Sequence, residues 1–83
     1  MEIIWTPPAI RDLRRIHRQT AERIREAVRR YATTQLGDVR KLEGEQDRYR
    51  LRVGEHRVIF RYERGRLVIV VLRVGHRRDA YRS

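Results

Sequence analysis

The spacing of apolar residues changes along the chain, and each change marks a new element. A β-branched and aromatic run from Glu2 to Trp5 predicts a strand. Thr6 is suited to cap a helix, and the two prolines after it suit a first helical turn. Ile10, Leu13 and His17 recur at the i, i+3, i+7 spacing of one helical face. We therefore expect a strand followed by a helix that ends near His17.

A second helix is predicted from about Thr20 to Thr33. Ile24, Val28 and Tyr31 recur there at i, i+4 and i+7, and arginines and glutamates occupy the other faces. The two predicted helices form a hairpin. The polar stretch from Gly37 to Asp47 contains turn-forming residues and is predicted to be a connection.

From Arg48 onward the apolar period shortens from 3.6 residues to 2, as is typical of strands. Arg48–Val53 and His56–Glu63 both alternate, and Gly54-Glu55 between them predicts a two-residue turn. Leu67–Val74 is apolar on both faces, as expected of a central strand, and Arg64-Gly65 predicts the turn before it. The predicted fold class is α+β: an N-terminal strand, a helix hairpin and a three-stranded antiparallel meander.

Composition limits the size and the partners of this fold. At 83 residues we expect one domain over residues 1–83, too small for a large cofactor cavity. The chain carries 21 Lys plus Arg against 11 Asp plus Glu, a net charge of +10, which favours a nucleic-acid partner. The absence of cysteine excludes disulfides and thiol chemistry, and no apolar stretch approaches the length of a membrane span. We expect a cytoplasmic protein with no membrane contact and no cofactor.

Nearly all of the positive charge is arginine, and strand pairing gathers it on one face of the predicted sheet. Across the Gly54-Glu55 turn, Leu51 is expected opposite Val58 on the core face, and Arg52 opposite Arg57 on the other. Like charges directly opposite one another are destabilising, so a phosphate-binding face is the preferred interpretation. The alternative is a solvated face whose arginines pair with nearby glutamates. The arginines expected on this face are Arg48, Arg50, Arg52, Arg57 and Arg61, with Arg48 opposite Arg61.

Histidines and one tyrosine are the candidates for proton chemistry. His76, in the polar tail beside Arg77, is the more credible functional histidine. Strand alternation directs His56 to the core or its rim, and His17 lies on an apolar helical stripe, so both are interpreted as structural. Tyr81 is either a packing anchor or a ring that stacks on a base or removes a proton. The histidine spacing fits no metal site, and none is expected.

Two segments resemble the RelE family of toxins from type II toxin-antitoxin systems. They are Tyr49-Arg-Leu-Arg-Val-Gly-Glu-His-Arg-Val-Ile-Phe60 and the tail Val74-Gly-His-Arg-Arg-Asp-Ala-Tyr81. Together they are typical of the RelE/ParE superfamily, whose order of elements matches the whole chain. The resemblance implies the RelE-like microbial RNase fold and an endoribonuclease that cuts messenger RNA in the ribosomal A site and inhibits translation. It also implies a RelB-type antitoxin, and a toxin-antitoxin complex that binds operator DNA.

The resemblance also implies site residues. The catalytic positions on the strands and in the tail are Arg50, Arg52, Arg57, Arg77 and Tyr81. The best-known relatives carry lysines where this chain has Arg50 and Arg52. Because arginine stays protonated, both can hold phosphate but neither can be the general base, which leaves Tyr81 or His76. The other basic residues expected to contact RNA are Arg48, Arg61, Arg78 and Lys41.

Two other classes of function stay open at this point. A ParE-like inhibitor of gyrase would use the same scaffold without nuclease chemistry, and its expression would damage DNA rather than halt translation. A non-catalytic nucleic-acid-binding module would bind with a strong dependence on salt and without cleavage. The set of arginines on one face favours the nuclease over the gyrase inhibitor.

Overall fold

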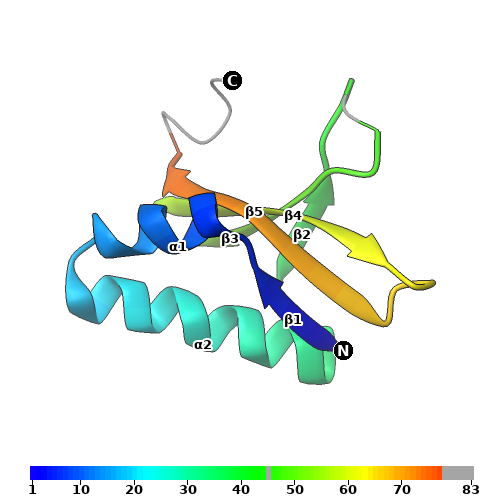
Figure 1. Ribbon diagram of the computed structural model, residues 1–83, viewed down its shortest axis with the longest axis horizontal. Coiled ribbons are helices and arrows are strands. Elements are labelled where there is room, and N and C mark those ends of the chain that lie inside the picture. The colour runs from blue at the N-terminus through cyan, green and yellow to red at the C-terminus, as the bar shows by residue number, and fades with distance from the viewer. Residues whose placement is uncertain (45, 78–83) are drawn as a thin grey trace.

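The computed structural model describes residues 1–44 and 46–77, which contain two helices and five strands. The elements are β1 (Glu2–Trp5), α1 (Pro7–Arg14), α2 (Arg18–Thr34), β2 (Asp38–Lys41), β3 (Tyr49–Val53), β4 (His56–Glu63) and β5 (Val68–His76). Figure 1 shows both helices on one face of the sheet. This two-layer arrangement confirms the predicted α+β fold class. Within the described ranges, no helix is both long and apolar enough to cross a membrane.

The strands lie side by side in the order β1-β5-β4-β3-β2. β1 pairs in parallel with β5, and the remaining neighbours are antiparallel. β5 is therefore an interior strand, as its doubly apolar sequence predicts. The β3–β4 hairpin has the predicted register, with the pairs Leu51–Val58, Tyr49–Phe60 and Arg52–Arg57.

The segment predicted as a connection contains a strand. β2 pairs antiparallel with β3 and places Val39 opposite Leu51. Its four residues include only one apolar side chain on the helix-side face, so the alternation is too brief to be recognised in the sequence. The prediction of an irregular connection from Gly37 was therefore wrong at residues 38–41.

α1 begins where its cap predicts. Thr6 Oγ1 accepts a hydrogen bond from the N–H of Ala9, and the two prolines fill the first turn. The same hydroxyl donates to the carbonyl oxygen of Val71 at 2.7 Å. Thr6 thus caps the helix and also fastens its start to β5.

The buried face of α1 differs from the predicted stripe of Ile10, Leu13 and His17. Leu13 is buried, but Ile10 is 38% exposed, and Ala9 and Asp12 complete the buried face instead. α1 ends at Arg14, before position 17, and Arg15 is its C-cap. His17 caps α2, and its Nδ1 accepts from the backbone N–H two residues later. Its role is structural, as predicted, but the predicted place on a helical face was wrong.

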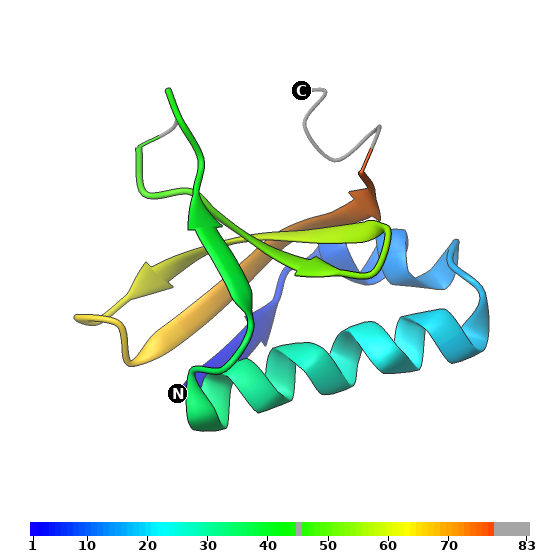
Figure 2. The ribbon, with the colours of Figure 1, turned by 180° about the vertical axis from the view of Figure 1, so that it is seen from behind.

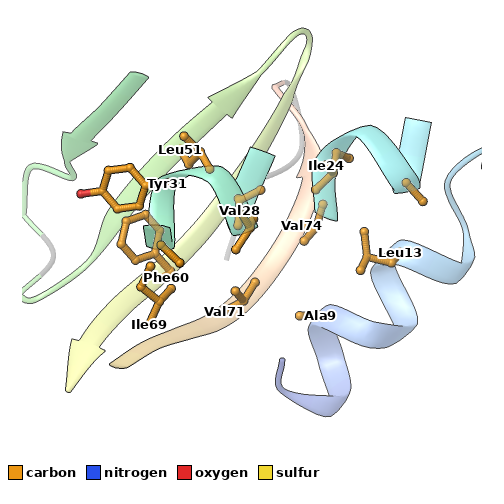
Figure 3. Close-up of a cluster of buried hydrophobic side chains, with 13 residues drawn as sticks. Ala9, Leu13, Ile24, Val28, Tyr31, Leu51, Phe60, Ile69, Val71 and Val74 are labelled. Atoms are coloured by element: carbon orange, nitrogen blue, oxygen red, sulfur yellow. The ribbon is translucent and has the colours of Figure 1, made fainter. Parts of the chain in front are cut away.

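The core lies between the helices and the sheet (Figure 3). Ile24, Val28 and Tyr31 of α2 are buried in it, which confirms the predicted face of that helix. Phe60 is 2% exposed, and its ring centroid lies 5.9 Å from that of Tyr31. Burying a side chain of this size contributes on the order of 2–3 kcal/mol. Leu51 of β3 joins the same cluster, so α2 holds the β3–β4 hairpin in place.

Asp12 is a buried carboxylate that the sequence pattern did not single out. It accepts hydrogen bonds from Arg73 Nε at 2.8 Å, from Arg73 Nη2 at 3.2 Å and from the N–H of Val74 at 2.8 Å. Burial on its own raises the pKa of Asp12, but the hydrogen bonds from Arg73 and Val74 outweigh it and lower that pKa. β1 pairs with β5 only as far as Val71. Beyond that point, Asp12 takes the place of a neighbouring strand by accepting the hydrogen bond from the N–H of Val74.

Candidate active site

The face of the sheet away from the helices carries the arginines. Directly paired residues share a face, so Asp38, Arg52, Arg57 and Gly75 form one row across β2, β3, β4 and β5. The next row begins with Arg40 on β2 and Arg50 on β3. We call the arginines of this outer surface the arginine face: Arg40, Arg50, Arg52, Arg57 and Arg61.

Arg52 and Arg57 lie directly opposite one another on the arginine face. Arg52 is exposed and its Nε donates to the carbonyl oxygen of Gly54 at 3.4 Å, whereas Arg57 is half-buried. Two facing guanidinium groups repel each other, and an anion bound between them removes that cost. Gly75 adds no side chain to the row next to Arg57. The row therefore has the charge and the donors to hold a phosphate group.

Two other arginines of this face are engaged with carboxylates. Arg50 is 8% exposed, and its Nη1 lies 3.4 Å from Asp38 Oδ1 and 3.3 Å from the Asp38 carbonyl oxygen. Arg61 pairs with Glu63 of its own strand. The alternative of a solvated, ion-paired face thus describes Arg61. Arg50 fastens β2 to β3 as well as lying beside the Arg52 row.

The presence of β2 determines which basic residue between positions 38 and 41 lies on the arginine face. Lys41 is predicted to contact RNA, but it pairs with Tyr49 and shares the helix-side face of the sheet. Arg40 pairs with Arg50 and lies on the arginine face. Sequence reasoning missed Arg40 because it treated the segment as a connection; assigning a strand from Asp38 would have found it.

His56 and His76 face each other at the end of the β4–β5 pair. Their ring centroids are 5.7 Å apart with the rings edge-on, and His76 Nε2 lies 3.5 Å from Glu55 Oε2. The orientation predicted for His56, toward the core rim, is confirmed. Strand alternation places both histidines on the helix side, opposite to Arg52 and Arg57. The His76 side chain is therefore on the opposite face of the sheet from the arginine row, and can approach that row only at the end of β5.

The stability of the fold should depend on the protonation of His56. Burial lowers the pKa of His56 and the neighbouring His76 lowers it further, while Glu55 acts in the opposite direction. The folded pKa lies below the ordinary 6.5, so the unfolded chain takes up the proton more readily as the pH falls through 6.5. We expect the free energy of unfolding to decrease from about pH 7.5 to about pH 5.5 in urea titrations. His56→Phe should reduce this pH dependence, and an unchanged dependence would contradict the assignment.

The remaining predicted site residues lie at or beyond the edges of the described structure. Arg48 precedes β3, whose pairing with β4 begins at Tyr49, so the predicted Arg48–Arg61 pair is not part of the observed register. The N–H of Arg77 donates to the carbonyl oxygen of Glu55 at 2.7 Å. Arg78 and Tyr81 lie outside the described residues. Among the residues that are described, no three His, Asp or Glu side chains gather as metal ligands.

Comparison with known proteins gives this geometry a family. A model of the family described as "ParE toxin of type II toxin-antitoxin system, parDE" matches residues 3–81. The archaeal RelE-RelB complex from Pyrococcus horikoshii OT3 contains a chain 26% identical to this one, covering 95% of this chain and 97% of that one, with a TM-score of 0.75. The RelB-RelE complex from Methanococcus jannaschii gives 23% identity, 94% coverage of each chain and a TM-score of 0.75.

A third similar structure is the YoeB/ParE toxin from Agrobacterium tumefaciens, at 23% identity, 92% and 98% coverage and a TM-score of 0.73. No curated protein matches the chain by sequence. The family match spans almost the entire chain, and the solved toxins share its fold, which confirms the resemblance found in the strand and tail segments. The chain therefore belongs to the ParE toxin family within the RelE/ParE superfamily, and is the toxin of a type II toxin-antitoxin system.

Proposed function

We propose that this toxin is an endoribonuclease that cuts messenger RNA in the ribosomal A site and thereby inhibits translation. The observation that carries the proposal is the Arg52–Arg57 pair on the outer face of the sheet. A scissile phosphate between the two guanidinium groups accepts hydrogen bonds from both, and these strengthen as negative charge builds up on its oxygens. The net charge of +10 attracts the RNA to this face.

The reaction assigns different tasks to the arginines and to the proton carriers. The 2′-hydroxyl of the RNA loses its proton as it attacks the adjacent phosphate, and the departing 5′-oxygen gains one. Arg52 and Arg57 stay protonated, so they bind the phosphate and stabilise the pentacovalent intermediate. The general base is His76 or Tyr81. For His76, the Nε2 atom lies 3.5 Å from Glu55 Oε2, so the ring is positioned by a carboxylate at the end of β5.

The other predicted residues extend the path of the RNA. Arg50 supports the Arg52 row through its hydrogen bond to Asp38 of β2. Arg77 follows β5, and its N–H bonds to Glu55 in the β3–β4 turn, close to the same row. The basic residues proposed to contact RNA outside the scissile phosphate are Arg48, Arg61, Arg78 and Lys41. Arg61 shares the arginine face, whereas Lys41 lies on the helix side and so contacts a different part of the bound RNA.

We infer that the partner is a RelB-type antitoxin, since two of the similar structures are RelB-RelE complexes. An acidic antitoxin segment complements the arginine face and neutralises the toxin by covering it. Action in the cytoplasm, on the ribosome, and binding of operator DNA by the toxin-antitoxin complex belong to the same proposal.

Gyrase inhibition without nuclease chemistry is the second candidate, and the ParE description of the family favours it. Inducing the toxin in cells and following amino-acid incorporation and DNA breaks in parallel separates the two. We expect translation to stop while the DNA stays intact, and co-expression of the neighbouring open reading frame to restore growth. An Arg52→Ala, Arg57→Ala double variant should no longer arrest translation. DNA breaks with continuing translation would contradict the nuclease and support the gyrase inhibitor.

A further inference from the structure

Beside the turn between β4 and β5 lies a cluster of two tyrosine rings, from β3 and β4, capped by an arginine of the turn. Figure 2 shows this turn, in yellow, at the opposite end of the sheet from the yellow-green β3–β4 turn, which lies beside the candidate active site. The rings of Tyr49 and Tyr62 are edge-on, with centroids 4.9 Å apart. The guanidinium carbon of Arg66 lies 4.7 Å from the centroid of Tyr62 and 5.8 Å from that of Tyr49. Arg66 Nη2 also donates to the hydroxyl of Tyr49 at 3.3 Å.

The two tyrosine rings contact side chains of the hydrophobic core. The hydroxyl of Tyr62 forms a short hydrogen bond with that of Tyr31 on α2. Phe60 packs against both rings, with centroids 5.3 Å from Tyr62 and 5.7 Å from Tyr49. Burial and the bond to Tyr31 raise the pKa of Tyr62, so its phenol stays neutral. The Tyr62 ring is therefore contacted by α2 through Tyr31 and by its own strand through Phe60, and its neutral phenol does not repel a phosphate.

The turn that presents Arg66 has an unusual backbone. Arg64 has φ 51° and Arg66 has φ 74°, on either side of Gly65 at 60°. Glycine and asparagine adopt this left-handed region at lower cost than arginine. Arginine thus gives the turn no backbone advantage, and strained residues of this kind are concentrated at functional sites. We therefore attribute the presence of arginine at positions 64 and 66 to a function of the two side chains.

We propose that this cluster, Tyr49, Tyr62, Arg64, Arg66 and Lys41, is a second RNA-binding site that holds an unpaired nucleotide. The tyrosine rings pack against one side of the planar Arg66 guanidinium, and the base stacks on its other, exposed side. Arg64 is exposed on the turn and Lys41 lies directly opposite Tyr49, and these two bind the flanking phosphates. Aromatic rings combined with arginine bind single strands with little sequence preference, because every base offers a flat face.

An acidic protein segment is the competing occupant of this surface. Such a segment would pair with Arg64, Arg66 and Lys41, but it would make no use of the planar stack on Tyr62 and Tyr49. A nucleotide uses both the charges and the stack, so RNA is favoured. The site lies at the far end of the sheet from Arg52 and needs no cleavage. It shares Lys41 with the RNA contacts proposed above, but the role of the tyrosine and arginine side chains goes beyond the proposed function and does not depend on cleavage.

Fluorescence anisotropy with a labelled, unstructured single-stranded RNA of about 12 nucleotides tests the site on the full chain. Removing one stacking side chain weakens single-strand binding substantially, so we expect Arg66→Ala to raise the Kd by about tenfold. Arg66→Lys keeps the charge and loses the plane, and should restore only a small part of the affinity. Arg29→Ala, an exposed arginine of α2, is the matched control for the loss of one charge and should change the Kd by less than about twofold.

Equal Kd values for Arg66→Ala and Arg29→Ala would overturn the proposal, and so would full restoration by Arg66→Lys. An equal loss of affinity for duplex RNA would overturn the assignment to an unpaired base. If the Kd for the antitoxin rises and that for RNA does not, the surface binds protein and the proposal is wrong. The Arg52→Ala, Arg57→Ala variant should retain the effect of Arg66→Ala on binding even when it cleaves nothing, which separates this site from the proposed nuclease.

Discussion

Arg57→Ala should slow messenger RNA cleavage by about 10²–10³-fold, because removing one donor that stabilises transition-state charge has typically this effect. Arg57 faces Arg52 across the β3–β4 hairpin and is half-buried, so it lies beside the position proposed for the scissile phosphate. Arg57→Lys keeps the charge without the planar fork and should lose less. The measurement is the single-turnover cleavage rate on ribosomes programmed with a defined A-site codon.

Arg29→Ala is the control for this experiment, since Arg29 lies exposed on α2 and its ion pairs with Glu22 and Glu26 are on the surface. Its cleavage rate should stay within about twofold of the unmodified toxin. Thermal unfolding of each variant checks that the fold is retained. A rate for Arg57→Ala that equals the rate for Arg29→Ala would exclude Arg57 from the active site.

Asp12→Ala should lower the free energy of unfolding by about 2–3 kcal/mol, because it removes a buried acceptor that serves three hydrogen bonds. The N–H of Val74 is then left without a partner, and Arg73 loses its carboxylate. The estimate lies at the low end for a buried pair, since the Arg73 side chain is 61% exposed and is resolvated in the variant. Urea unfolding near neutral pH measures the change.

The pH dependence of Asp12→Asn provides a second test. The folded pKa of Asp12 lies below its ordinary 3.8, so its ionised form stabilises the fold above that pH. The stability difference between the unmodified chain and Asp12→Asn should therefore shrink as the pH falls through 3.8 toward the lowered pKa. Glu22→Ala removes an exposed carboxylate of α2 and should cause a much smaller loss than Asp12→Ala. Similar losses for the two alanine variants would contradict this role of Asp12.

The parts of the fold that could be predicted are those whose signal is local. The period-2 alternation on both sides of Gly54-Glu55 fixes the register of β3 and β4, since a slip of one residue would turn every apolar side chain outward. The Arg52–Arg57 pair follows from that register alone. The face of α2 was likewise predictable, because 17 residues contain enough turns for the period to be clear.

The parts that could not be predicted depend on contacts between distant segments. β2 is recognisable only by its pairing with β3. Without that strand, neither the place of Arg40 on the arginine face nor the ion pair between Asp38 and Arg50 can be predicted. The bond of Asp12 to Arg73 joins residues 61 positions apart. No local pattern marks such a contact, and a single acidic residue among the arginines of α1 resembles an ordinary surface charge.

The candidate site divides in the same way. The positions of Arg52 and Arg57 follow from one hairpin, whereas the facing pair of His56 and His76 depends on the register of β5 against β4. That register shifts between Ile59 and Phe60, an irregularity that no sequence pattern announces. The arginine face and the orientation of His56 were thus predictable in outline, while the position of His76 opposite His56 was not.

Primer extension on messenger RNA bound to programmed ribosomes, after addition of purified toxin, tests the central claim most directly. The nuclease proposal predicts new RNA ends within the A-site codon, and none with the Arg52→Ala, Arg57→Ala variant or after prior addition of antitoxin. Intact A-site messenger RNA in the presence of a toxin preparation that still arrests cell growth would contradict it.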